Sequence, residues 1–117
     1  MPKGMRPERL ADALRAELST LIAEHVRDPR VKKAGLATVT HVRVTTDLQH
    51  ARVLVSFVGG EDGSAKAAIE ALQKTAGFLA GEATRHMNLR RAPILTFAHD
   101  DSAEHIEKIE KLLRGDE

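Results

Sequence analysis

The sequence predicts an α+β fold, in which three short strands alternate with helices. The apolar residues follow a helical three-and-four spacing up to about residue 26, alternate at every second residue between 36 and 58, and return to the helical spacing after residue 65. Proline and glycine mark the changes of period, at Pro29, at Gly59-Gly60 and at Pro93. The predicted order is helix, strand, strand, bent helix, strand, helix.

The first helix is predicted over residues 6–26. One side of it is apolar and consists of Leu10, Ala13, Leu14, Leu18, Leu21 and Ile22. Asp28-Pro29 ends this helix, because the residue before a proline avoids helical angles. The residues that follow, 30–33, are mostly basic, and we expect them to form a loop that closes at Gly35.

Two strands joined by a short polar turn are predicted next, an arrangement typical of a hairpin. Residues 36–46 and 51–58 are the strands, and residues 47–50 are the turn. The glycine-rich loop 59–64 is not expected to cradle a phosphate group. It contains two acidic residues and lacks the GK[ST] ending of a phosphate-binding loop.

The long helix that starts near Ala65 has Gly77 close to its middle. Glycine in a helix costs about 1 kcal/mol relative to alanine, and it favours a bend or a split into two helices. If the bend packs on the sheet, a larger side chain at Gly77 should collide with neighbouring backbone. The alternative is a straight helix in which Gly77 and Gly81 allow close packing.

The end of the chain is predicted to contain a third strand and a last helix. Pro93 stops the helical region, and residues 94–98 follow as the strand. Ser102 is expected to cap the last helix. The apolar side of that helix, with Ile106, Ile109 and Leu112, is expected to pack on the domain.

Length and composition favour one domain over residues 1–117, with disordered ends at 1–5 and 115–117. The sequence has no cysteine, no start typical of a signal peptide, and no apolar run near the ~20 residues that a membrane span needs. We therefore expect a cytoplasmic monomer without a membrane contact. All three phenylalanines are expected in the core, so that RNA binding would depend on backbone charge and shape rather than on base stacking.

Charge is unevenly distributed along the chain, although the net charge is only +1. Residues 1–33 hold eight basic and five acidic side chains, and residues 74–91 hold four and one. Residues 100–117 hold three basic and seven acidic side chains. Two basic blocks and an acidic end favour a polyanion as partner, and a merely solvated charge pattern is the alternative.

The residue pattern gives little support for catalysis or metal binding. No two of the six histidines have the spacing that places two ligands on one helix face. Asp100 and Asp101 are expected to favour the positive end of the last helix rather than to form an acid–base pair. The serines lack a nucleophile signature. We therefore expect a protein that is not an enzyme and needs neither metal nor cofactor.

Several stretches, taken in order, resemble the ribosome-binding factor A family of bacterial assembly factors. They are Arg6 with Arg9, Asp28-Pro29-Arg30, residues 42–48 running into 51–53, residues 89–93, and Phe97 with residues 100–102. The resemblance implies a type II KH-like fold, a three-stranded sheet covered on one face by helices. In this family a kink of the form Ala-x-Gly replaces the GXXG loop of ordinary KH domains. The kink falls at Thr75, Ala76 and Gly77, with Thr75 in place of the alanine, and Ala80 stands where the family tends to have an arginine.

The resemblance also implies a role and partners. The chain would bind the immature small ribosomal subunit and its rRNA, assist late maturation and rRNA processing, and leave before translation; assembly GTPases are further candidate partners. Arginine and lysine are expected to grip the RNA backbone, because both bind phosphate. The expected RNA-binding residues are Arg6, Arg9, Lys32, Lys33, Lys74, Arg85, Arg90 and Arg91. The alternative is a KH-like protein-interaction module that uses the acidic C-terminal helix.

Overall fold

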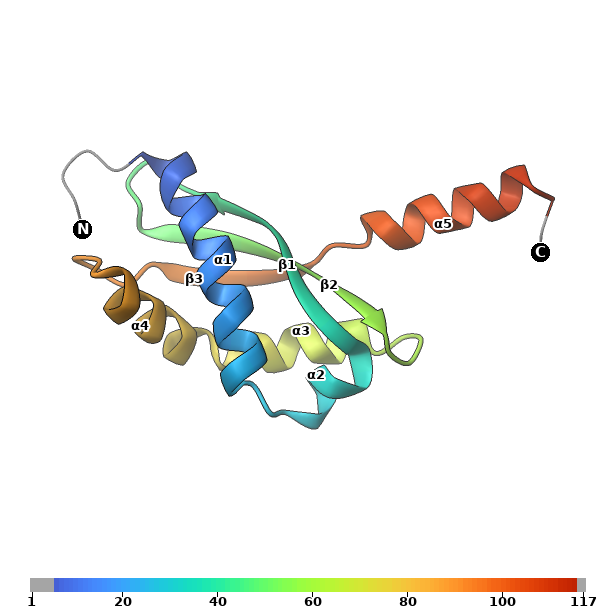
Figure 1. Ribbon diagram of the computed structural model, residues 1–117, viewed down its shortest axis with the longest axis horizontal. Helices are drawn as coiled ribbons and strands as arrows, with labels where there is room; N and C mark the ends of the chain where they lie inside the picture. The colour runs from blue at the N-terminus through green and yellow to red at the C-terminus, as the bar shows by residue number, and fades with distance from the viewer. Residues whose placement is uncertain (1–5, 116–117) are drawn as a thin grey trace.

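The computed structural model describes residues 6–115, in which five helices and three strands confirm the predicted α+β fold (Figure 1). Their bounds are α1 Pro7–His25, α2 Pro29–Ala34, β1 Gly35–Val44, β2 His50–Gly59, α3 Ala65–Lys74, α4 Ala76–Met87, β3 Ile94–His99 and α5 Ser102–Leu113. The ends expected to be disordered lie outside the described residues, apart from Gly115. Within residues 6–115, no helix combines the length and the apolar character that crossing a membrane requires.

Helix α2 corrects the prediction of a loop after Pro29. Asp28 begins the helix, because its carboxylate accepts a hydrogen bond from the Arg30 N–H at 2.9 Å. Pro29 suits the first helical position, where no N–H is needed. The guanidinium of Arg30 also bonds this carboxylate, at 2.9 Å, and lowers the pKa of Asp28.

The sheet has the order β1-β2-β3, in which β1 and β2 are antiparallel and β2 and β3 are parallel. Parallel neighbours need a long crossover connection, which α3 and α4 supply. The β1–β2 register shifts by one residue between Val39 and His41. This bulge at Thr40 keeps Val39, Val42 and Val44 on the same, inward face.

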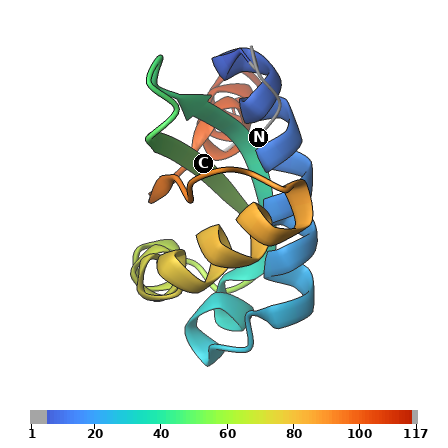
Figure 2. The ribbon, with the colours of Figure 1, turned by 90° about the vertical axis from the view of Figure 1, so that its left-hand side faces the viewer.

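The core lies between one face of the sheet and the helices. Figure 2 shows α1 running along this face with α4 beside it. The largest fully buried side chains are Leu10, Leu14, Leu18, Leu21, Val53, Val55, Leu72 and Leu79. The opposite face remains open, and its outward side chains Leu36, Val58 and Ile94 are 69%, 62% and 59% exposed. The helices therefore cover one face only, as a KH-like fold requires.

The helical region after residue 65 divides at Thr75, which separates α3 from α4. The Thr75 hydroxyl donates to the carbonyl of Leu72 at 2.8 Å and so satisfies an orphan acceptor at the end of α3. Gly77 is exposed, and a Cβ added there would meet no atom within 4 Å. The expected collision at Gly77 is therefore wrong, because the glycine faces outward from the second position of α4.

Helix α5 projects away from the rest of the molecule, as Figure 1 shows. Ile106, Ile109 and Leu112 are 57%, 50% and 71% exposed, so the expected packing of this helix on the domain is wrong. The prediction for phenylalanine holds in part. Phe97 is buried and Phe57 is half-buried, whereas Phe78 is exposed and forms a T-shaped contact with the His25 ring.

Candidate nucleic-acid interface

Three segments distant in the sequence meet where the β1–β2 hairpin turns. The Ile94 N–H donates to the Gln49 carbonyl at 2.8 Å, which brings the loop before β3 to the hairpin turn. The first turns of α1 lie beside the end of β1 and line a shallow hollow with it. We call these segments, residues 6–9, 45–49 and 88–93, the hairpin end.

Four of the eight expected RNA-binding residues belong to the hairpin end. Arg6 and Arg9 come from the start of α1, and Arg90 and Arg91 come from the loop before β3. All four side chains are exposed, and none of them forms an ion pair with a side chain that the structure describes. Their positive charge is therefore available to a ligand.

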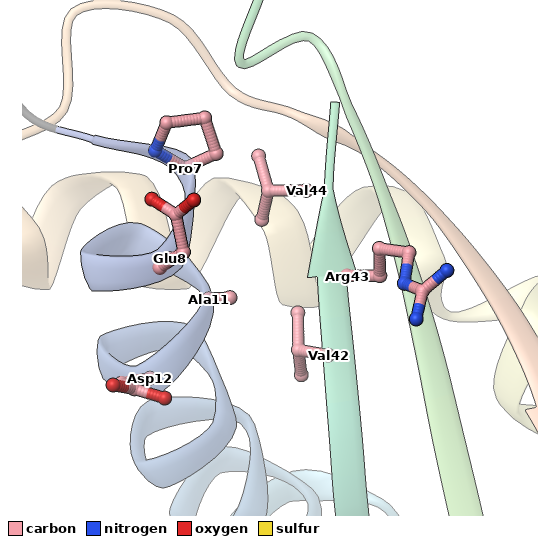
Figure 3. A pocket seen from close by; sticks show the side chains of 7 residues that line it. All are labelled: Pro7, Glu8, Ala11, Asp12, Val42, Arg43 and Val44. Carbon is pink, nitrogen blue, oxygen red and sulfur yellow. The ribbon is translucent and has the colours of Figure 1, made fainter. Parts of the chain in front are cut away.

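The hairpin end contains two acidic residues, Glu8 and Asp47, and Asp12 lies one turn after Glu8 on the α1 side of the hollow (Figure 3). Glu8 and Asp12 line it together with Pro7 and Ala11, whereas Val42 and Val44 point toward α1 from β1. Arg43 points the other way, toward β2, because neighbouring residues of a strand face opposite sides. The positive charge of β1 is thus separated from these two acids.

A second basic group lies at the other end of the sheet. Helix α2 carries Lys32 and Lys33 and leads directly into Gly35, which pairs with Gly59, nine residues along β2 from the hairpin turn. Lys74 ends α3 close enough to Asp28 to help lower its pKa, after the larger effect of Arg30. Lys33 is partly neutralised by Glu61, with Nζ and Oε2 3.8 Å apart. The eight residues therefore do not form one patch.

Arg85 is engaged within the protein. Its guanidinium bonds the carboxylate of Glu82 one turn earlier in α4. His86 on the same turn contacts Glu17 of α1, with Nδ1 and Oε1 2.5 Å apart. An ion pair at the surface is weak, so Arg85 keeps some capacity for phosphate, but less than the unpaired arginines.

Sequence reasoning overlooked Arg43 and Arg52, which lie on the open face of the sheet. They are direct partners in the β1–β2 register, and both are exposed. Counting pairs outward from the predicted turn, 47–50, would have placed Arg43 opposite Leu54, so their pairing follows only from the register that the structure shows. For metals, no group of three or more potential ligands occurs in the part of the chain that the structure describes.

Comparison with known proteins gives a consistent result. The sequence model of "Ribosome-binding factor A" matches residues 6–113. A ribosome-binding factor A of Desulfitobacterium hafniense is 44% identical over 110 residues, which are 94% of this chain and 85% of the relative. That of Thermomicrobium roseum is 42% identical over 109 residues, or 93% and 81% of the two chains.

The chain belongs to the ribosome-binding factor A family. Solved structures of the family have the same fold. The crystal structure of a Thermus thermophilus member matches with a TM-score of 0.67 and 27% identity, over 81% of this chain and 97% of that one. The solution structure from Thermotoga maritima, described as a putative ribosome binding factor A, matches with a TM-score of 0.62 and 31% identity, over 85% and 94%.

One comparison concerns a family member in a complex. Coordinates of a Thermus thermophilus ribosome binding factor A, fitted into a cryo-EM map of a 30S–RbfA complex, match with a TM-score of 0.58 and 27% identity. The match covers 82% of this chain and 92% of that one.

Proposed function

We propose that this chain binds the immature small ribosomal subunit through its rRNA and assists late maturation and rRNA processing as a non-catalytic assembly factor. Family membership supports the partner, since the Thermus thermophilus relative was fitted into a 30S complex. The contact surface is proposed at the hairpin end because its four arginines form no ion pair with the side chains that the structure describes.

The proposed mechanism is steric and electrostatic. Arg90 and Arg91 precede a strand whose start is fixed to the hairpin turn, so the folded chain fixes their position. A guanidinium fork gives paired hydrogen bonds to a phosphate, and phosphate contacts set position and register without reading sequence. The bound domain would thus hold an unfinished rRNA conformation by its backbone. Lys32, Lys33 and Lys74 would contact a separate segment of RNA from the other end of the sheet.

Salt dependence of binding tests this proposal. If roughly six phosphates are neutralised, the slope of log affinity against log salt should be about −4 to −5. Replacing both Arg90 and Arg91 with alanine should reduce this slope by about 2 and weaken binding to different RNAs alike. The matched control is Arg15→Ala with Lys66→Ala, which removes the same charge from exposed positions on α1 and α3. Equal slopes for the two double variants would exclude the hairpin end as the contact.

The second candidate function is a protein-interaction module that uses α5. The observation in its favour is the apolar side of α5, which is exposed and lies apart from the core. Co-sedimentation from a cell lysate separates the two functions. Recovery of rRNA in free small subunits supports the assembly factor, whereas RNA-independent enrichment of one protein supports the interaction module.

A further inference from the structure

The open face of the sheet has an unusual charge composition. No residue of β1, β2 or β3 is Asp or Glu, whereas the outward positions of β1 and β2 carry two arginines and two histidines. The nearest acids, Asp47 and Asp100, lie in the hairpin turn and beyond the end of β3. Each is already hydrogen-bonded to a threonine hydroxyl. The basic side chains of this face therefore gather in the half nearest the hairpin turn, where the charges of Asp47 and Asp100 act on His50 and His41.

Arg43 and Arg52 lie on this face close to the hairpin turn, Arg43 on the edge strand β1 and Arg52 on the middle strand β2. They are directly opposite in an antiparallel pair, which places their Cα atoms about 4.5–5.5 Å apart. Neither forms an ion pair with any side chain in the described part of the structure. Like charges in this position destabilise a sheet. An anion bound between the two guanidinium groups would attract both and so offset their mutual repulsion.

The surroundings of the pair can receive such an anion. A hollow of about 500 Å³ is lined by Arg43 and Arg52 together with His41 and Leu54. Thr96 is the β3 partner of Arg52 and supplies a hydroxyl beside it. Guanidinium forks and hydroxyls are hydrogen-bond donors of the kind that a phosphate accepts.

We propose that the part of the open face around Arg43 and Arg52 is a second binding site for RNA backbone phosphate. The inference rests on the proposed function and extends it to a face of the sheet that no helix covers. The site is continuous with the hairpin end, because His50 pairs with Ile94, which directly follows the loop containing Arg90 and Arg91. One RNA strand can therefore contact both. Continuity with this basic loop favours RNA over an acidic protein as the occupant.

The decisive variant is Arg43→Glu, which places an acid opposite Arg52. An opposite-charge pair stabilises an antiparallel sheet, so the variant should melt at the same temperature as the parent or higher. Its affinity for purified small subunits, and for a uridine 20-mer RNA, should nevertheless fall roughly tenfold at moderate salt, because two cationic contacts are lost. A lower affinity in a more stable protein cannot come from misfolding.

The matched comparison uses alanine. Arg43→Ala with Arg52→Ala should reduce the salt slope for the uridine RNA by about 2. The control, Arg15→Ala with Lys66→Ala, removes the same charge from helices on the covered side and should change the slope much less. An open-face variant that behaves like the control, while Arg90→Ala with Arg91→Ala weakens binding, would overturn this inference and leave the proposed function standing.

Two further outcomes would also overturn the inference. If the parent binds neither small subunits nor the uridine RNA, the proposed function fails, and the open-face site fails with it. A glutamate homopolymer tests an acidic protein partner. If Arg43→Glu abolishes binding of that peptide and leaves RNA binding intact, the open face is a site for acidic protein.

Discussion

At the scale of single residues, Asp100 connects three elements. Its carboxylate accepts a hydrogen bond from the hydroxyl of Thr40 at 2.5 Å, within the β1 bulge, and another from the Ser102 N–H at 3.0 Å, at the start of α5. Its own N–H donates to Val55 of β2 at 2.8 Å. The side chain of Ser102, then Thr40, then the Ser102 N–H lower the pKa of Asp100 to about 2.

The lowered pKa of Asp100 predicts a pH-dependent contribution to stability. A carboxyl whose folded pKa lies below its unfolded value of 3.8 stabilises the fold above about pH 4, and the effect is lost as pH falls toward 2. Asp100→Asn should therefore lower the free energy of unfolding by ~1 kcal/mol at neutral pH, a value reduced for partial exposure. Urea unfolding should show this difference shrinking toward pH 2, whereas the control Asp62→Asn, at an exposed position in the loop after β2, should change the free energy of unfolding by no more than ~0.5 kcal/mol. A difference that is constant with pH would contradict the role of the charge.

Two glycines predict stability changes of opposite sign. A Cβ on Gly60 would lie 2.0 Å from the carbonyl carbon of Ala34, whereas one on Gly77 would meet open space. Gly60→Ala should cost about 2 kcal/mol or more, because backbone must move. Gly77→Ala should raise stability by up to ~1 kcal/mol through helix propensity. Thermal melting of both variants checks this, and a destabilised Gly77→Ala protein would mean that the start of α4 is packed after all.

At the scale of elements, the exposed edge of β3 is covered by a side chain of α3. Strand β3 is the last of the sheet, so the backbone groups on its outer edge have no neighbouring strand. Gln73 donates from Nε2 to the Leu95 carbonyl at 3.0 Å and accepts from the Phe97 N–H at 2.8 Å. An unpaired strand edge can pair with a strand of another chain. The Gln73 amide bonds two backbone groups of this edge and so makes them unavailable for such pairing.

Substitution of Gln73 tests this cover one bond at a time. Gln73→Glu keeps an acceptor for the Phe97 N–H but sets a carboxylate against the Leu95 carbonyl, and Gln73→Met removes both bonds. Each should cost about 1–2 kcal/mol of unfolding free energy. Hydrogen exchange distinguishes them, because the Phe97 amide should stay protected with Glu and exchange faster with Met. Equal protection of the Phe97 amide in both variants would show that the side chain at position 73 does not protect this edge.

The sequence predicts the long, strongly periodic elements well and the short or terminal ones poorly. Helix α1 and the hairpin strands lie within two residues of their predicted bounds, because burial imposes their period. Helix α2 was missed because six residues do not complete two turns, although Asp28-Pro29 is a helix start. For α5, periodicity shows that one side of the helix is apolar, but it does not show whether that side packs on the domain. Individual arginines could be listed from the sequence, but their grouping depends on strand register and on the α1–β1 packing.

At the scale of the whole molecule, charge and shape are polarised together. The molecule measures 54 × 29 × 17 Å, and α5 extends along its longest axis (Figure 1). The open face belongs to the sheet and the hairpin end joins the sheet to the start of α1, whereas α5 leads away from both. The proposed RNA site and the acidic helix are thus separate parts of one chain.

Removal of α5 tests whether this separation is functional. A chain that stops after Ser102 retains the hydrogen bonds of Asp100 and loses five acidic and three basic residues. Because the apolar side chains of α5 are exposed, unfolding free energy should change by no more than ~0.5 kcal/mol. Affinity for small subunits and for the uridine RNA should stay the same or rise, because the removed segment has a net negative charge and repels phosphate. If the truncated chain melts like the parent but no longer binds small subunits, while the uridine RNA still binds, α5 must contact a protein partner on the subunit. That outcome would join the two candidate functions in one molecule, with the sheet layer binding RNA and α5 binding protein.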